Sequence, residues 1–126
     1  MKKIVIAIIS ILLLSGCGSA SATLNYKQIS TDEAVTMMQE QSDYIILDVR
    51  TEEEYEEKHI PGAICIPNET IGAEAIPELA DKGQLVMVYC RSGNRSKQAA
   101  EKLAKLGYTN IVEFGGINDW NGEIEK

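Results

Sequence analysis

Short apolar runs alternate with amphipathic segments along most of the chain, and this pattern predicts an α/β fold. The apolar runs are rich in β-branched residues and are typical of strands buried on both faces of a sheet. They span Tyr44–Val49, Ala63–Ile66, Leu85–Tyr89 and Ile111–Phe114. Because helical segments separate these runs, we expect a mostly parallel sheet covered by helices on both faces.

Capping signals indicate where the helices begin and end. Ser30 with Glu33, and Thr51 with Glu54, match the pattern in which a hydroxyl and a glutamate three residues later satisfy each other's backbone donors. These pairs predict helices from Ser30 to about Gln41 and from Thr51 through Glu57. A further helix is expected from near Arg95 to Gly107, where glycine ends it. A looser helical stretch is expected after a cap at Asn68, with an interruption at Pro77. A final helix is expected to carry Trp120 as a core residue.

The strand Leu85–Tyr89 ends at Cys90, and a polar loop then opens the next helix. The loop consists of Arg91, Ser92, Gly93, Asn94, Arg95 and Ser96. Unpaired loop amides, a helix amino terminus and two guanidinium groups all favour negative charge, so we expect the thiol pKa to fall below its usual value of about 8.5. Since the thiolate is the nucleophile, the loop predicts a reactive cysteine in an anion-binding cradle. The alternative is an inert core cysteine at a strand end.

Two charged residues, Asp48 and Arg50, end the strand Tyr44–Val49 at the same edge of the sheet. Ligands of such sheets collect outside the carboxyl ends of the strands. The two residues are therefore either supports for the Cys90 loop or a structural ion pair that ties the strand end to neighbouring backbone, and the second interpretation is favoured. His59 precedes the next strand, so we expect it toward the opposite edge as a buried or capping residue.

The amino-terminal segment is not expected to belong to this fold. Lys2 and Lys3 precede an apolar stretch, Ile4–Leu14, which is too short for a permanent membrane span and has the size of a signal-peptide core. It ends in Leu14-Ser15-Gly16-Cys17, which resembles the bacterial lipobox. This resemblance implies a signal peptide over residues 1–16, and a lipidated Cys17 with palmitate among its acyl chains.

These assignments divide the chain into three parts. Residues 17–23 would form a lipidated cysteine and flexible tether, and residues 24–126 a single domain held on the extracytoplasmic face of a bacterial membrane. A plain secretory peptide or an uncleaved anchor is the alternative.

Composition narrows the function further. A chain of 126 residues suits one domain, and its net charge of −7 excludes nucleic acid as a partner, since phosphate binding needs a basic face. No cysteines or histidines have metal-ligand spacing, so no metal is expected. Cys65 is expected in a strand core, with a Cys65–Cys90 disulfide as the alternative in an oxidising compartment.

Taken together, the motifs resemble a single-domain rhodanese. They run in order over nearly the whole of residues 24–120: Leu47-Asp48-Val49-Arg50, Glu54-Tyr55, His59-Ile60-Pro61-Gly62-Ala63, Ile66-Pro67, Cys90-Arg91-Ser92-Gly93-Asn94-Arg95-Ser96, Gly107-Tyr108 and Gly115-Gly116-Ile117 with Trp120. The resemblance implies a three-layer α/β/α fold with an essentially parallel five-stranded sheet. It also implies sulfurtransferase activity at Cys90, with Arg91–Arg95 as the cradle.

The reaction implied by the resemblance moves sulfur from a small anionic donor, such as thiosulfate, to a thiol or to cyanide through a Cys90 persulfide. It needs no metal or organic cofactor, and a monomer is expected. One competing function is a cysteine-dependent phosphatase or arsenate reductase, but related phosphatases have five residues between cysteine and arginine, whereas Cys90 and Arg95 enclose four. The other is a non-catalytic rhodanese module for binding or sensing.

Overall fold

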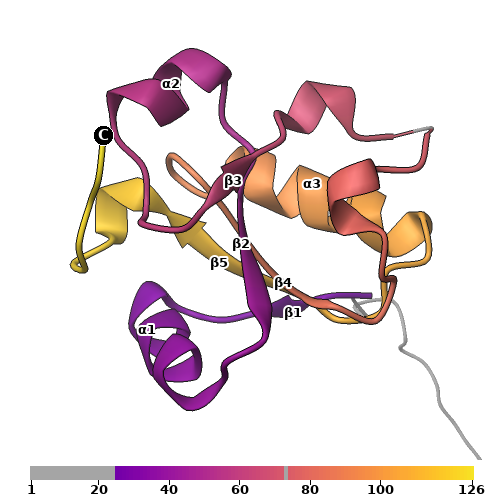
Figure 1. The fold of residues 1–126 in the computed structure, drawn as a ribbon, viewed down its shortest axis with the longest axis horizontal. Helices are drawn as coiled ribbons and strands as arrows, with labels where there is room; N and C mark the ends of the chain where they lie inside the picture. Colours follow the sequence, from indigo (N-terminus) through magenta and orange to yellow (C-terminus); the bar gives the residue numbers. More distant parts are fainter. Residues whose placement is uncertain (1–24, 73) are drawn as a thin grey trace, which may run out of the picture.

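The computed structural model describes residues 25–72 and 74–126 (Figure 1). The signal-peptide, lipidation and tether predictions for residues 1–23, including Cys17, lie outside the described residues. Among the described residues, no helix combines the length and the apolar character needed to cross a membrane.

Five parallel strands form one sheet, which confirms the predicted fold class. The strands are β1 (Lys27–Gln28), β2 (Tyr44–Asp48), β3 (Ile64–Cys65), β4 (Leu85–Cys90) and β5 (Ile111–Gly116), in the order β1-β5-β4-β2-β3. The central strand β4 is the one that ends at Cys90. It pairs with β2 through Asp48 and Tyr89, and with β5 through Cys90 and Gly116.

Among the described residues, three helices and two short 3₁₀ turns lie between the strands, and a third turn follows β5. The helices are α1 (Thr31–Glu40), α2 (Glu52–Glu57) and α3 (Asn94–Lys105), and the turns are η2 (Asn68–Thr70), η3 (Pro77–Leu79) and η4 (Ile117–Asp119). Both predicted capping boxes are present, with Ser30 and Glu33 on α1 and Thr51 and Glu54 on α2.

The prediction of a final helix around Trp120 is wrong. Only the turn η4 forms, and Trp120 ends it by donating its backbone N–H to the Ile117 carbonyl. Asn118 and Asp119 are poor helix formers because their side chains compete for backbone partners. The half-buried Trp120 packs instead on the aliphatic and aromatic residues of the sheet, with its ring centroid 5.9 Å from that of Phe114. Likewise, the looser helix expected after Asn68 is replaced by η2 and η3.

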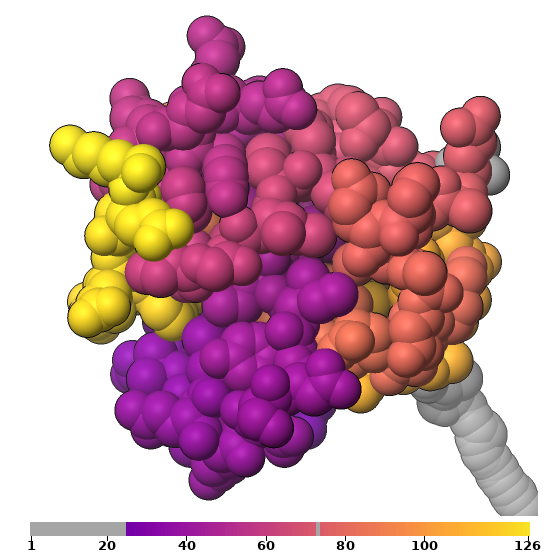
Figure 2. Space-filling model, viewed as in Figure 1, coloured from indigo at the N-terminus to yellow at the C-terminus, as the bar shows by residue number. Residues whose placement is uncertain are grey.

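Side chains alternate between two hydrophobic cores, one on each face of the sheet. Val88 and Cys90 lie in the core beneath α3, whereas Met87 and Tyr89 lie in the core beneath α1. Figure 2 shows the α1 segment, drawn in indigo, and the carboxyl-terminal residues, drawn in yellow, on the same side of the molecular surface. Adjacent residues at the end of β4 therefore face different environments.

Candidate active site

The Cys90 side chain lies at the carboxyl end of β4 and is covered by the loop that follows it. The Gly93 N–H donates to Cys90 Sγ at 3.0 Å, and the residue is 1% exposed. Gly93 is the N-cap of α3 and has φ +112°, a left-handed conformation that glycine adopts without steric cost. This conformation turns a loop amide onto the sulfur, as an anion-binding cradle requires.

Ser96, in the first turn of α3, is the second polar residue in contact with the thiol. Its Oγ lies 3.4 Å from Cys90 Sγ and 2.6 Å from a carboxylate oxygen of Glu113. Both Ser96 and Glu113 are buried, at 0% and 2% exposure. The Ser96 hydroxyl therefore lies between the sulfur and a buried carboxylate.

The end of β5 supports the loop from below. A Cβ on Gly116 would overlap the Arg91 carbonyl and stand 2.6 Å from the Ser92 amide nitrogen, so only glycine allows this approach. The Asn118 N–H donates to the same Arg91 carbonyl at 3.1 Å. The Gly115-Gly116 pair of the sequence motif thus sets the position of the loop backbone.

The remaining loop side chains differ in their surroundings. Arg91, Ser92 and Asn94 are exposed, while Arg95 is half-buried and bound by Glu54 of α2 at 2.7 and 3.0 Å. The hydrogen bond from Arg95 is the main cause that lowers the pKa of Glu54 to about 2. Arg91 is therefore the loop guanidinium without a carboxylate partner among the described residues.

Asp48 and Arg50 form the ion pair that the structural interpretation predicts. Arg50 Nη2 binds Asp48 at 2.7 Å and the Lys58 carbonyl at 2.7 Å, and both side chains are buried. The Tyr89 hydroxyl also donates to Asp48, at 2.7 Å. Burial and the neighbouring Asp48 carboxylate raise the pKa of Tyr89. Because Tyr89 and Cys90 point to opposite faces of β4, this network lies on the other face from the thiol.

The prediction that His59 lies toward the opposite edge of the sheet is wrong. Its neighbours contact the carboxyl ends of the strands, since Lys58 binds Arg50 and the Ile60 N–H donates to the Tyr89 hydroxyl at 3.1 Å. β3 has only two residues and pairs with the end of β2, so the chain need not return along the whole sheet.

His59 is buried and acts as a cap. One ring nitrogen lies 2.7 Å from the Tyr55 carbonyl and the other 3.2 Å from Glu125, while the ring stacks on that of Tyr55. Its contacts are thus with α2 and the carboxyl-terminal residues, and not with Cys90.

Cys65 and Cys90 are both free thiols in the structure. Burial raises the pKa of Cys65 to about 11, with the nearby Asp48 carboxylate adding to the effect. Cys65 is therefore a protonated thiol at neutral pH.

Two contacts of the site were not predicted from the sequence. The sequence places Glu54 in a helix cap and in the Glu54-Tyr55 motif, but it does not predict the contact with Arg95, which is 41 positions away. The motifs of the sequence do not single out Glu113. The signal that could identify it is a single charged residue inside an otherwise apolar strand. When both faces of such a strand are buried, the charged side chain needs a polar partner from elsewhere in the fold.

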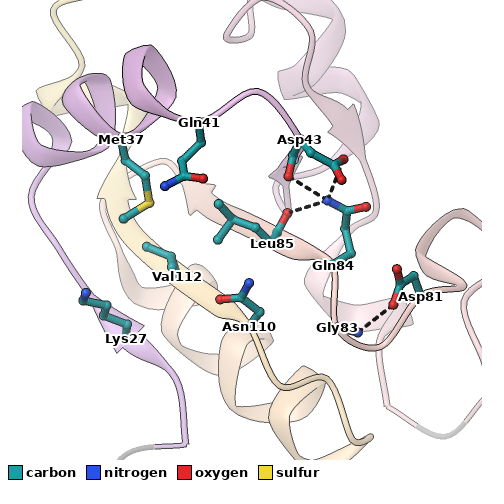
Figure 3. A pocket seen from close by; sticks show the side chains of 10 residues that line it. All are labelled: Lys27, Met37, Gln41, Asp43, Asp81, Gly83, Gln84, Leu85, Asn110 and Val112. Carbon is teal, nitrogen blue, oxygen red and sulfur yellow. Dashed lines mark hydrogen bonds between the residues drawn. The ribbon is translucent and has the colours of Figure 1, made fainter.

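A separate pocket lies at the amino ends of the strands, on the opposite edge from Cys90 (Figure 3). It is lined by Lys27, Met37, Gln41, Asp43, Asp81, Gly83, Gln84, Leu85, Asn110 and Val112. Leu85 and Cys90 are the two ends of β4, about 17 Å apart at the usual rise of a strand. Within the described part of the chain, no group of three or more histidine, cysteine or acidic residues has the geometry of a metal site.

Known proteins with similar sequences include sulfurtransferases. Thiosulfate sulfurtransferase PspE of Escherichia coli (strain K12) is 40% identical over 73 residues, covering 58% of this chain and 70% of that protein. Thiosulfate sulfurtransferase GlpE of Coxiella burnetii (strain RSA 493 / Nine Mile phase I) is 35% identical over 96 residues, covering 75% and 87%.

Solved structures with a similar fold include rhodaneses and rhodanese-like domains. A rhodanese with anions from E. coli has a TM-score of 0.61 at 36% identity, covering 66% of this chain and 98% of that one. The solution structure of a rhodanese-like domain from Anabaena sp. has a TM-score of 0.70 at 26% identity, covering 78% and 77%. The model of the rhodanese-like domain family matches residues 30–123, and the chain therefore belongs to that family.

Proposed function

We propose that the protein is a sulfurtransferase that moves sulfane sulfur from a donor such as thiosulfate to a thiol or cyanide acceptor through a persulfide on Cys90. The observation that carries this proposal is the Gly93 N–H directed at Cys90 Sγ, at the head of a Cys-Arg-Ser-Gly-Asn-Arg loop. Relatives named thiosulfate sulfurtransferase, and a neighbour whose structure is described with anions, support the same chemistry.

In the first half-reaction, the Cys90 thiolate attacks the outer sulfur of the donor. The new S–S bond forms as the donor's own S–S bond breaks, and the electron pair of that bond leaves with sulfite. The Gly93 amide then stabilises the negative charge on the sulfur held in the loop. Arg91, an exposed residue of the loop, attracts the anionic donor.

In the second half-reaction, a thiolate or cyanide attacks the terminal sulfur of the persulfide. The bond between the two sulfur atoms breaks, and its electron pair returns to Cys90. The acceptor leaves as a persulfide or as thiocyanate, and the enzyme is ready for another donor.

The test measures sulfite release, thiocyanate release and phosphate-ester hydrolysis in parallel, for the wild type, Cys90→Ser and the matched control Cys65→Ser. We expect sulfite and thiocyanate from the wild type and from Cys65→Ser, no product from Cys90→Ser, and a Cys90 peptide heavier by one sulfur atom. Hydrolysis of the phosphate ester alone would indicate a phosphatase. Activity toward neither substrate would indicate a non-catalytic module.

We also propose that Cys17 carries a lipid that anchors the domain at the extracytoplasmic face of a bacterial membrane. The support is the lipobox Leu14-Ser15-Gly16-Cys17 behind the apolar stretch Ile4–Leu14. Expression of the full chain with radiolabelled palmitate in a bacterial host tests it. The wild type should be labelled and sediment with membranes, and Cys17→Ala should lose the label, whereas equal labelling of both would contradict the proposal.

A further inference from the structure

Glu113 is a buried carboxylate that the chemistry described above does not use. It is 2% exposed, and no lysine, arginine or histidine of the described residues forms a salt bridge with it. One of its oxygens, Oε2, accepts hydrogen bonds from Ser96 Oγ at 2.6 Å and from the Gly115 N–H at 2.9 Å. A buried carboxylate without a cation is costly, so its proximity to the reacting thiol calls for an explanation.

The hydrogen-bond directions connect this carboxylate to Cys90. Ser96 Oγ lies 2.6 Å from Glu113 Oε2, 3.0 Å from the Gly93 carbonyl and 3.3 Å from the Gly115 carbonyl. The hydroxyl has one proton, and we assign it to Glu113 because that contact is the shortest and its acceptor is charged. Its oxygen is then free to accept from the Cys90 thiol, 3.4 Å away. Thiol, hydroxyl and carboxylate thus form a directed chain of two hydrogen bonds.

We propose that Glu113 is the proton-holding residue of the site and receives the Cys90 proton through Ser96. The thiol proton moves to Ser96 Oγ while the Ser96 proton moves to Glu113 Oε2. Afterwards the protonated Glu113 donates to Ser96, and Ser96 donates to the thiolate. One concerted shift therefore reverses both hydrogen bonds and changes an arrangement that favours the thiol into one that stabilises the anionic sulfur.

This inference rests on the proposed function for the role of Glu113 in turnover. In each half-reaction, the movement of one proton between Cys90 and Glu113 keeps the total charge of the two groups constant. Before reaction, Glu113 is negative and Cys90 neutral. After thiosulfate transfers its outer sulfur and sulfite leaves as a dianion, the persulfide is negative and Glu113 holds the proton. When a thiolate acceptor removes the terminal sulfur, Cys90 recovers that proton. At each stage the pair carries one negative charge, which avoids the strong repulsion between two buried anions.

The groups around the pair fit this assignment. On the β1 side, burial and the carboxylates of Glu113 and Glu101 raise the pKa of Tyr26, so its phenol stays neutral. On the α3 side, Arg95 is bound by Glu54. Arg91 is exposed at the mouth of the loop. Within the described residues, the Ser96 hydroxyl is the side-chain donor that reaches Glu113.

The first experiment needs no sulfur donor. Iodoacetamide alkylation of the full chain is followed between pH 5 and 10, and the rate at Cys90 is read from its own peptide by mass spectrometry. We expect two steps in the wild-type profile, because two coupled groups lose two protons, and a single step in Glu113→Gln. Glu101→Gln, which removes a nearby exposed carboxylate from α3, should keep both steps. A Glu113→Gln profile with as many steps as the wild type would overturn the proposal.

Ser96→Ala provides a second variant if Glu113→Gln does not fold. It removes the hydroxyl that donates to the thiolate, so the alkylation rate on the plateau between the two steps should fall about tenfold. An unchanged plateau would contradict the relay.

The second experiment separates this inference from the proposed function. The infrared difference spectrum between the thiol and persulfide forms should contain a carboxylic acid band that shifts in D₂O and is absent from Glu113→Gln. If the persulfide forms without that band, the assignment of Glu113 is wrong while the sulfurtransferase proposal survives. If no persulfide forms, the sulfurtransferase proposal fails, and the alkylation profile still decides whether the proton relay exists.

Discussion

The two carboxylate oxygens of Glu54 bind the guanidinium of Arg95 at 2.7 and 3.0 Å, and this pair joins α2 to the first turn of α3. The same carboxylate accepts from the Thr51 backbone N–H at 3.0 Å and completes the cap of α2. One side chain therefore holds both a helix end and the last arginine of the Cys90 loop. Hence Arg95 tethers the loop as well as carrying positive charge.

This pair predicts a specific loss of stability in acid. The folded pKa of Glu54 is about 2, below its ordinary value of 4.5. A lowered pKa contributes stability that is complete above the unfolded value and is lost as the pH falls from about 4.5 to about 2. Glu54→Gln should lower the free energy of unfolding at pH 7 by on the order of 1 kcal/mol, because part of the pair is exposed and screened.

Urea denaturation at pH 7, 4.5, 3 and 2 measures the effect, with Glu57→Gln, an exposed residue of the same helix, as the control. The difference between the wild type and Glu54→Gln should shrink toward zero at pH 2. A difference that is constant across the four pH values would show that the contact contributes no charge-dependent stability.

The buried pair of Asp48 and Arg50 predicts a change in stability without a change in rate. Asp48→Asn leaves the buried Arg50 without its counter-charge, which costs about 3 kcal/mol or more. Because the network lies on the α1 face, the rate of sulfur transfer by the folded protein should stay within about twofold of the wild type. Unfolding and sulfite-release measurements at low temperature check both statements.

The control for this prediction is Asp43→Asn, an exposed aspartate just before β2. It removes the same charge from the surface and should alter neither quantity. If Asp48→Asn instead lowered the rate tenfold in protein that remained folded, Asp48 would influence the loop through its charge, and the purely structural interpretation would be incorrect.

The close contact of Gly116 with the loop predicts that alanine is not tolerated there. A Cβ at this position overlaps the Arg91 carbonyl, so either β5 or the loop must move. We expect at least a tenfold slower sulfite release from Gly116→Ala and a lower melting temperature. Gly72→Ala is the matched control because a Cβ there meets no atom within 4 Å. Wild-type rates in Gly116→Ala would show that the loop does not depend on this support.

Much of this fold could be predicted from local patterns. The apolar runs predict the strands β2, β3, β4 and β5, and the two capping boxes predict α1 and α2. Both signals depend on residues that are close together in the sequence. β1 was not predicted, since Lys27 and Gln28 form an exposed two-residue strand with no apolar pattern. The sequence predicts a helix where only the turn η4 forms, because the packing of Trp120 on Phe114 is a tertiary contact.

In the site too, the local features could be predicted from the sequence and the tertiary contacts could not. Cys90 and its loop are contiguous, so the loop residues could be identified together. The partners of that loop come from elsewhere: Glu54 binds Arg95, Glu113 binds Ser96, and Gly116 lies against Arg91. No local spacing encodes these pairs, since they arise only when β4 pairs with β5 and the fold brings Glu54 of α2 to the first turn of α3.

Arg91 is expected to attract the donor without taking part in the chemistry. It is exposed, and unlike Arg95 it has no salt bridge with a described residue. Arg91→Gln should raise the KM for thiosulfate about three- to tenfold and leave kcat within about twofold, because a surface charge steers an anion toward the site. The effect should diminish from low salt to 0.5 M salt as the charge is screened.

Lys105→Gln is the matched control for Arg91→Gln. This variant removes the same charge at the far end of α3, about 16 Å from the start of the helix at the usual helical rise. At that distance, the field of the Lys105 charge at the loop is largely screened. Its KM should therefore equal that of the wild type. A salt-independent rise in KM for Arg91→Gln would mean that Arg91 contacts the bound donor directly. A fall in kcat at unchanged KM would place its effect on the transferring sulfur, and steering would no longer account for it.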